Sequence, residues 1–438
     1  MPEISSTNPL TGFLAGIENP EAGCSTIDSI LEAVRNHLGM EIAFAARYVG
    51  DERQFTHISS AIPVPSAPGD REPADRSYCY HVLHGRLPEL IQNAGDLEFA
   101  STLPITAALP VGAHITVPLR FSDGSLYGSF CCLSRDPDYS LTARDLATVR
   151  AFAELAGRQI ERERKGEETK LAWRARVEEA IAEHQPVIHL QPIHRLSDGR
   201  TVGAEALARF PDARDRPPNL WFDEAGEVGL GLELELAAVR QALAVLAYVP
   251  SDQYLSVNVS PETILSGAVE PLVRAASGRA LVLEITEHKQ VKDIPELKRQ
   301  LARLRPHARI AIDDVGAGYA GLQHIIAFEP DILKLDLSLT RDIDRDSAKR
   351  ALTAAMVGFA SLTGSVIVAE GVEREGERKV LEDLGLLYGQ GWLFSRAMPV
   401  VKAQQLMLGV GTVPASPARP EIDAVRNAAA VRALGESR

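Results

Sequence analysis

Residues 309–337 decide the fold of this chain, and they read RIAIDDVGAGYAGLQHIIAFEPDILKLDL. The segment holds two apolar strands, Arg309–Asp314 and Ile332–Leu337, and a glycine-containing loop, Val315–Gly318, follows the first of them. Acidic residues stand near the downstream end of each strand. Charges that recur in otherwise apolar strands are not explained by packing, because burial of an unpaired carboxylate is costly. The segment therefore predicts buried strands whose downstream ends carry functional polar groups.

The same pattern of short apolar strands extends along the chain in both directions. Six further strands are predicted at Val187–Ile193, Gly203–Phe210, Tyr254–Ser260, Leu281–Glu287, Val366–Glu370 and Leu387–Phe394. Amphipathic helices occupy most of the intervals, for example at Ile294–Leu304, Ala348–Leu362 and Glu375–Leu384. Strands that alternate with helices in this way favour an α/β fold, a TIM-like (β/α)8 barrel, over an open sheet.

The N-terminal part of the chain shows a different pattern, in which short strands follow one amphipathic stretch. These strands are predicted at Ile42–Tyr48, Gln54–Ala61, Leu90–Gln92, His114–Arg120 and Leu126–Leu133. Strands with flanking helices indicate an α+β domain whose sheet is packed on one face. A helical run from Thr142 to Glu183 follows, and it is either a solvated linker helix or a helix that pairs two protomers.

Chain length indicates more than one domain, because 438 residues are too many for a single core of typical size. We predict an N-terminal extension (1–21), the α+β domain (22–162), a helical linker (163–177), the barrel (178–410) and a C-terminal tail (411–438).

Charge and cysteine content narrow the class of protein. The formal net charge of −13 disfavours a nucleic-acid partner, so that a phosphate-bearing substrate would need cations or backbone amides at the site. No apolar stretch predicts a membrane span, and the first ten residues include no basic residue of the kind that a secretory signal carries. The four cysteines show no metal-ligand spacing. We therefore expect a cytoplasmic protein with reduced thiols.

Polar side chains recur at the downstream ends of the barrel strands, which converge on one mouth of such a barrel. The set comprises Glu205, Asn258, Glu284, Asp313, Asp314, Lys334, Glu370 and Gln390. Carboxylates brought together repel one another unless cations neutralise them, and all-oxygen ligands select Mg²⁺ or Mn²⁺. Two such ions, about 3.5–4 Å apart, activate a water and stabilise the leaving oxygen of an in-line phosphoryl displacement. The residue types thus favour phosphodiester hydrolysis.

A series of ordered motifs makes the resemblance to a known family specific. Along the chain these are QPI from Gln191, EALAR from Glu205, NVS from Asn258, EITE from Glu284, DDVGAGYAGL from Asp313, LKLD from Leu333, AEGVE from Ala369 and GQGW from Gly389. The ordered set resembles the signature of EAL phosphodiesterases over roughly residues 174–401. The resemblance implies metal-dependent hydrolysis of cyclic di-GMP to the linear dinucleotide pGpG.

The resemblance also implies a role for each matching residue. A first metal ion would be held by Glu205, Asn258, Glu284 and Asp313, and a second by Asp313, Asp314 and Glu370. The attacking water would be oriented and deprotonated with the help of Lys334, assisted by Gln390. The substrate would be contacted by Gln191 and Arg209 and supported nearby by Glu373, while Glu287 would anchor the loop after Asp314.

Two motifs depart from the family pattern. The usual Asp-Asp-Phe-Gly-Thr-Gly-Tyr has Val315 in place of the aromatic residue and Ala317 in place of the hydroxyl residue. The usual Ala-Glu before the first long helix reads Ala225-Gly226. None of these residues is an implied metal ligand, so we expect an active enzyme of low or tightly regulated rate.

The N-terminal domain resembles a GAF domain. The resemblance lies in HGRLPELIQNAG from His84 and in ITVPLRFSDGSLYGSFCCLS from Ile115, a strand, tight turn and strand of that type. It implies a sensory domain that regulates the barrel, either with an unknown small molecule bound or with no ligand at all. Cys79 and His81 suggest a chromophore or haem ligand, and the alternative is that both are ordinary buried residues.

Other interpretations remain open. The barrel could bind cyclic di-GMP as a receptor without cleaving it, or it could cleave another phosphodiester. Lys334 could form a buried pair with Asp336. Trp221 and Trp392 are of a type more often found in a core than in a nucleobase site, although Trp392, next to Gln390, could also lie near the mouth of the barrel. We also expect a homodimer, for which the long helix is the candidate interface.

Overall fold

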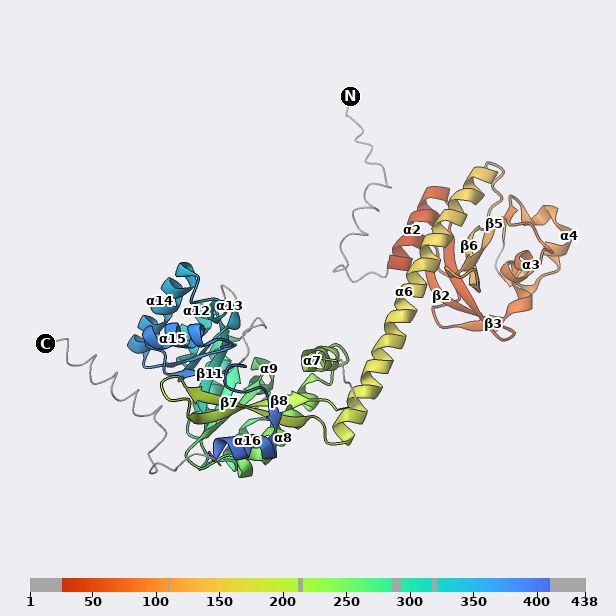
Figure 1. Cartoon of the computed structure of the whole chain (residues 1–438). Helices are drawn as coiled ribbons and strands as arrows, with labels where there is room; N and C mark the ends of the chain where they lie inside the picture. The colour runs from red at the N-terminus through yellow and green to blue at the C-terminus, as the bar shows by residue number, and fades with distance from the viewer. Residues whose placement is uncertain (1–25, 109–110, 212–215, 286–292, 317–320, 410–438) are drawn as a thin grey trace. The chain divides into compact units, whose positions relative to one another are not determined.

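The computed structural model describes residues 26–108, 111–211, 216–285, 293–316 and 321–409 (Figure 1). Residue contacts divide the chain into two compact units, with the division after Thr169. Each unit has its own sheet, one of six strands and one of nine.

The C-terminal unit is built on a closed barrel of short strands. In chain order these are β7 (Val187–Arg195), β8 (Thr201–Arg209), β9 (Tyr254–Val259), β10 (Leu281–Ile285), β11 (Arg309–Val315), β12 (Ile332–Leu335), β13 (Val366–Ala369) and β14 (Tyr388–Gly389). Each strand pairs with the next, and β14 pairs with β7 to close the ring. The short strand β15 (Met398–Pro399) is added beside β7. The predicted α/β barrel is therefore confirmed.

Two features of the barrel differ from the prediction. Strand β7 runs antiparallel to both of its barrel neighbours, β8 and β14, because a short connection links β7 to β8 as a hairpin. The predicted last strand, Leu387–Phe394, is shorter in the structure and spans only Tyr388–Gly389. The backbone turns at Gln390, whose N–H donates to the Ala369 carbonyl and whose carbonyl accepts from the Val372 N–H.

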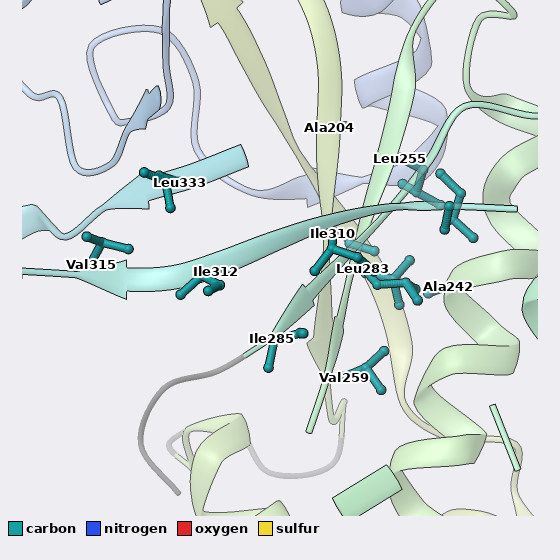
Figure 2. Packing of buried hydrophobic residues seen from close by; sticks show 14 of the residues in the cluster. Ala204, Ala242, Leu255, Val259, Leu283, Ile285, Ile310, Ile312, Val315 and Leu333 are labelled. Atoms are coloured by element: carbon teal, nitrogen blue, oxygen red, sulfur yellow. The ribbon is translucent and has the colours of Figure 1, made fainter. Parts of the chain in front are cut away.

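Helices surround the barrel on its outer side. They are α7 (Pro218–Glu227), α8 (Gly231–Ala244), α9 (Pro261–Leu265), α10 (Glu270–Ala275), α11 (Ile294–Leu304), α12 (Gly321–Phe328), α13 (Leu337–Thr340), α14 (Ser347–Thr363), α15 (Glu375–Asp383) and α16 (Val400–Met407). Their apolar faces pack against outward-pointing strand residues in one large core, part of which Figure 2 shows around Leu283, Ile310 and Ala242.

Alternation along each strand divides the barrel residues into two sets. On β10, Leu281, Leu283 and Ile285 belong to the outer core with the helices, whereas Val282 belongs to a separate cluster of strand residues. That cluster lies inside the barrel and consists of Ile193, Tyr254, Val282, Ala311, Ile332, Val366, Val368 and Tyr388. Glu284 follows Val282 by two residues and therefore also faces inward. Each inward face thus begins apolar and ends polar.

Gly203 of β8 makes room for this internal cluster. A Cβ atom at Gly203 would lie 2.6 Å from the ring of Tyr254, with which it is paired in register. Tyr254 is 2% exposed and cannot move away without disturbing the other internal residues. A glycine at this position therefore lets the large ring fill the base of the barrel.

The N-terminal unit is an antiparallel sheet with strand order β3-β2-β1-β6-β5-β4. These strands are β1 (Ile42–Val49), β2 (Glu52–Ser60), β3 (Arg71–Pro73), β4 (Leu90–Ile91), β5 (Ala113–Arg120) and β6 (Leu126–Ser134). One face packs on α2 (Thr26–Leu38) and on the first part of α6. The other face packs against α3 (Tyr78–Leu83) through Cys79. The short helices α4 (Glu98–Ser101) and α5 (Pro104–Ala108) follow α3 in the chain. The predicted α+β domain is present.

Helix α6 (Ala143–Ala182) is a single helix of 40 residues that passes through Gly166 without a break. Its early residues Val149, Ala153 and Ile160 belong to the core of the N-terminal unit. Its late residues Val177 and Ala180 belong to a cluster in the C-terminal unit. Residues 162–172 between these two parts are exposed. The predicted linker thus lies inside one continuous helix.

A search of the described helices for a membrane-spanning segment found none that is both long enough and apolar enough.

We expect Gly203→Ala to lower the free energy of unfolding by about 1–3 kcal/mol, because the added methyl group overpacks the barrel interior against Tyr254. The matched control is Gly358→Ala on the exposed side of α14, where a Cβ meets no atom. This control should raise stability by about 0.5–1 kcal/mol through the higher helix propensity of alanine. Urea unfolding measures both, and equal effects would contradict the packing argument.

Candidate active site

The candidate active site lies at the polar ends of the inward strand faces. Glu205 comes from β8, Asn258 from β9, Glu284 from β10, Asp313 and Asp314 from β11, Lys334 from β12, Glu370 directly after β13, and Gln390 directly after β14. Each of these side chains except Asp314 follows an inward-facing apolar or small residue by two positions. The barrel therefore brings together the set that the sequence predicted.

The Lys334 ammonium group is the centre of this set. Its Nζ atom lies 2.6 Å from a carboxylate oxygen of Glu370, 2.8 Å from Glu284, 3.0 Å from Asp313 and 3.5 Å from Glu205. The side chain is 2% exposed. Asp336, the alternative partner, instead caps α13 by accepting a hydrogen bond from the Ser338 N–H. The proposed Lys334–Asp336 pair is therefore not formed.

Amide and hydroxyl groups hold the carboxylates of Glu205 and Glu284 in place. Asn258 donates to Glu205 Oε1 at 3.0 Å, and Gln390 donates to Glu205 Oε2 at 2.6 Å. Gln390 also donates to Gln191 Oε1 at 3.1 Å. The Ser256 hydroxyl donates to Glu284, a contact that the sequence analysis did not predict. The sequence does contain a signal for this contact. Ser256 precedes Asn258 by two residues on β9 and therefore lies on the same inward face.

Asp313 and Asp314 are neighbours in the chain, yet both reach the same site. Together with Glu370 they offer carboxylate oxygens that all lie within 4.8 Å of one another. The register of β11 against β12 shifts between Ile312 and Val315, and Asp314 has a positive φ of 55°. A bulge with a left-handed residue, which aspartate tolerates, turns the second side chain toward the side of the first.

Burial and neighbouring charges together shift the pKa values of several groups in the site. Burial raises the pKa of Glu370 to about 8 and that of Glu284 well above its usual value, although Lys334 opposes both shifts. Burial also opposes the charge of Glu205, but Lys334 and the Gln390 hydrogen bond bring its pKa below the usual value. Burial alone would lower the pKa of Lys334, and the surrounding carboxylates outweigh it, so that the pKa lies well above normal.

The donor set fits divalent cations. Four carboxylates contact one ammonium group, and Asp314 adds a fifth carboxylate beside Asp313 and Glu370, so the negative charge exceeds what Lys334 neutralises. Asp313 Oδ1 is buried and, among the residues that the structure describes, accepts no hydrogen bond of good geometry, although Lys334 Nζ lies 3.0 Å away. Carboxylate and amide oxygens are the ligands that hard cations such as Mg²⁺ and Mn²⁺ prefer.

A cleft of about 610 Å³ lies between β8, β9 and the helices α7 and α8, and it shares Asn258 with the site. Its lining includes Arg209 and Asn258, together with Asn219 and Asp223 of α7 and Glu235 of α8. Asn219 and Asp223 are four residues apart and therefore lie on the same face of α7. This spacing is a signal in the sequence for a polar helix face at the cleft. Arg209 donates to the Ala208 carbonyl at 2.7 Å, and burial lowers its pKa.

Several predicted residues lie apart from the carboxylate cluster. Glu373 forms an ion pair with Arg341 at 2.8 Å. Glu287 and Ala317 lie outside the described residues, so the predicted loop anchor is not placed. Trp392 is 58% exposed with Arg396 over its ring at 4.0 Å, which corrects the expectation of a core position. Trp221 is buried and stacked on Phe210, as a core residue would be.

The two departures from the family pattern are compatible with the fold. Val315 is 3% exposed and packs in the outer core with the helices. Gly226 lies in α7 at a place where a Cβ would meet no atom, so a larger residue is sterically acceptable there. Neither departure removes a group from the carboxylate cluster.

Fold and site together define a barrel protein with a carboxylate-rich, lysine-centred mouth. Comparison with known families makes the assignment specific, because a family model described as "EAL domain" matches residues 174–397. The chain belongs to this family. A second model, described as "GAF domain", matches residues 25–160.

Individual relatives extend this comparison. The chain is 30% identical over 236 residues to "Probable cyclic di-GMP phosphodiesterase PdeB" of Escherichia coli (strain K12), covering 51% of this chain and 45% of that protein. It is 30% identical over 373 residues to an "Uncharacterized signaling protein" of Caulobacter vibrioides, covering 82% and 42%. The chain thus spans less than half the length of these curated relatives. The solved EAL enzyme Bd1971, bound to cAMP and cyclic di-GMP, is 18% identical with a TM-score of 0.51, covering 84% of this chain and 93% of that one, which shows a shared fold.

We expect Lys334→Met to lower the free energy of unfolding by about 3–5 kcal/mol at pH 8 in the presence of a chelator, because the carboxylates lose the ammonium group at the cluster's centre. The variant should regain stability as the pH falls. Glu370 and Glu284 have raised pKa values in the folded protein, so the folded state binds protons more tightly than the unfolded state and is favoured at low pH.

The control for this prediction is Lys298→Met, which removes an exposed partner of Glu329 and should change stability by less than about 1 kcal/mol at any pH. Urea unfolding between pH 5 and pH 8 makes the comparison. A Lys334→Met variant with a pH-independent loss would show that the carboxylates are not electrostatically coupled to Lys334.

Proposed function

We propose that this protein hydrolyses one phosphodiester bond of cyclic di-GMP and releases pGpG. The observation that carries the proposal is the grouping of Asp313, Asp314 and Glu370 beside Lys334 at the end of the barrel. Membership of the EAL family and the PdeB relative support the choice of substrate.

We propose that Glu205, Asn258, Glu284 and Asp313 hold one divalent cation, Mg²⁺ or Mn²⁺, and that Asp313, Asp314 and Glu370 hold a second. When bound, such ions neutralise the carboxylates, lower the pKa of a water ligand and polarise the phosphoryl oxygens. In the structure, the hydrogen bonds from Asn258 and Gln390 already fix both oxygens of Glu205. Preformed donors of this kind reduce the reorganisation needed for catalysis.

Lys334 orients the attacking water through its N–H groups. In the structure it is a hydrogen-bond donor to the carboxylates, because these raise its pKa well above the usual value. It can share in deprotonating the water only once the negative charge around it is neutralised. Gln390 extends the water network, since it donates to both Glu205 and Gln191.

Substrate contacts are proposed on the cleft side of the site. Arg209 lines the cleft and can direct its guanidinium group to a phosphate, for which its planar donors are suited. Gln191 lies beside Gln390 and can contact the phosphate or a guanine edge. For Glu373, which is paired with Arg341, and for Glu287, which lies outside the described residues, we keep the supporting and loop-anchoring roles that the family resemblance implies.

A receptor that binds cyclic di-GMP without cleaving it is the alternative function. The complete carboxylate set argues against it, because binding alone does not require so much uncompensated negative charge beside a phosphate. Incubation with Mg²⁺ or Mn²⁺ followed by chromatography for pGpG distinguishes the two. Competition by linear dinucleotides and cyclic mononucleotides tests whether another phosphodiester is preferred.

We expect Asp313→Asn to reduce pGpG formation by about 10²–10³-fold or more, because the variant loses a charged group proposed to bridge both cations. The matched control is Asp336→Asn on the neighbouring strand end. Asparagine caps a helix as well as aspartate does, so the cap on α13 is retained and the rate should stay within about twofold. A wild-type chain that binds cyclic di-GMP with either ion yet yields no pGpG would establish the receptor function instead.

We further propose that the GAF domain (22–162) regulates the barrel domain (178–410) of a homodimer through the linker within α6. A small molecule in the N-terminal sheet would provide the signal. The supporting observation is that one helix contributes side chains to the cores of both units. A rotation of the helix about its axis would thus be transmitted from one core to the other.

We expect a two-residue insertion after Gly166 to change turnover several-fold in the full chain, because it rotates the later part of α6 by about 200° relative to the earlier part. A seven-residue insertion changes the phase by only about 20° and should preserve the rate of the unaltered chain. Steady-state pGpG formation measures both variants. If they behave alike, the phase of α6 does not carry the signal.

A further inference from the structure

A second cluster of potential metal ligands lies in the N-terminal unit. Cys79, His114 and Cys131 each offer one ligand atom, and these atoms all lie within 4.8 Å of one another. The three residues are at most 2% exposed. They are far apart in sequence, on α3, β5 and β6, which is why the spacing of the cysteines gave no metal motif.

The sheet register explains how these residues meet. Thr116 of β5 is paired with Cys131 of β6, and His114 precedes Thr116 by two residues on the same face. Helix α3 covers that face and places Cys79 over it, with Cys79 Sγ 2.8 Å from Cys131 Sγ and 4.0 Å from His114 Nε2. His81, which the sequence suggested together with Cys79 as a chromophore or haem ligand, instead bonds the Asp75 carbonyl at 2.7 Å. The histidine near Cys79 is therefore His114.

The charges around the cluster are compatible with a divalent ion bound to two thiolates. Arg53 is buried and donates to Cys79 Sγ at 3.2 Å, but it is also ion-paired with Glu72. This pair is neutral, so it neither repels a cation nor supplies a full counter-charge to two thiolates. A dication bound to two thiolates and a neutral imidazole is likewise neutral, and a buried neutral assembly avoids the cost of an isolated charge.

A cavity of about 90 Å³ adjoins the cluster. Cys79 and His114 line it, with Arg53 and Glu72 on its polar side and mainly apolar residues elsewhere. Three protein ligands beside an internal space are the arrangement of a metal site that keeps one coordination position open. A hydroxyl group is also in place, since Thr116 Oγ1 donates to Cys131 Sγ at 3.3 Å.

We propose that Cys79, His114 and Cys131 bind one borderline transition-metal ion, Zn²⁺ or Fe²⁺, with the fourth coordination position facing the cavity. Thiolate sulfur and imidazole nitrogen select ions of this class and reject the hard cations proposed for the barrel. Metal–sulfur bonds of about 2.3 Å in a tetrahedral site place two sulfur atoms about 3.8 Å apart. The sulfur atoms therefore separate by roughly 1 Å on binding, through small side-chain rotations. Water or a small ligand in the cavity occupies the open position.

Cobalt titration of the full-length, fully reduced chain tests this site. Co²⁺ bound to thiolates gives a sulfur-to-metal charge-transfer band, which cobalt bound to the carboxylates of the barrel does not give. We expect a band that saturates at one Co²⁺ per chain and is displaced by Zn²⁺. Cys79→Ser and Cys131→Ser should abolish it, and Thr116→Val should weaken cobalt binding roughly 10-fold through the lost hydroxyl contact.

The matched control is Cys132→Ser. Cys132 is adjacent to Cys131 and equally buried, but it lies on the opposite face of β6 in the core with α2. This variant should keep the band, and Cys24→Ser should do the same. Far-UV circular dichroism confirms that each variant is folded. X-ray absorption of the wild-type chain with one equivalent of Zn²⁺ gives a second readout that needs no variant, with two sulfur and at least one nitrogen donors expected.

The proposal is overturned if the reduced wild-type chain gives no charge-transfer band, or if the band persists in Cys79→Ser. It is also overturned if the reduced chain binds no metal here and hydrogen peroxide instead links Cys79 to Cys131. In that reaction the two thiols lose two hydrogen atoms and peroxide is reduced to two waters, so the pair would serve redox chemistry.

Discussion

The structure of the barrel mouth depends on one buried ammonium group, that of Lys334, held among carboxylates from four different segments. A single positive charge cannot neutralise them all. The pKa values of Glu284 and Glu370 are therefore raised, chiefly by burial and further by the neighbouring carboxylates. The protein tolerates this because closure of the ring, completed by the two-residue pairing of β14 with β7, holds each strand end in place. The site is therefore preformed and electrostatically strained, which is the arrangement expected of the cation site that we propose here.

The upstream half of each strand stabilises the fold against this electrostatic strain. Inward residues at the upstream ends form the apolar cluster that includes Tyr254 and Tyr388, and inward residues two positions later form the polar site. Outward residues bury the barrel against its helices. The large apolar core thus offsets the free-energy cost of gathering like charges, as expected where function conflicts with stability. The same alternation in the N-terminal sheet sends adjacent Cys131 and Cys132 into different cores.

Family membership and local chemistry lead to the same proposal by separate routes. The ordered motifs indicate an EAL domain, and oxygen-rich clustering beside a lysine indicates cation-assisted phosphodiester chemistry whatever the family. The N-terminal unit supplies a contrast, because its buried ligands are sulfur and nitrogen. Two sites of opposite chemical softness in one chain would allow two kinds of ion to act without exchanging places.

The sequence by itself determined the barrel, the α+β domain and which polar side chains gather around Lys334, because periodicity and strand-end acidity are local properties. It did not determine the partner of Lys334: Lys-x-Asp suggested Asp336, whereas the ring places Glu284 nearer. The direction of β7, the bulge that brings Asp314 beside Asp313, and the approach of His114 to Cys79 were also decided only in three dimensions. Each depends on contacts between residues far apart in the chain, and such contacts leave no periodic signal in the sequence.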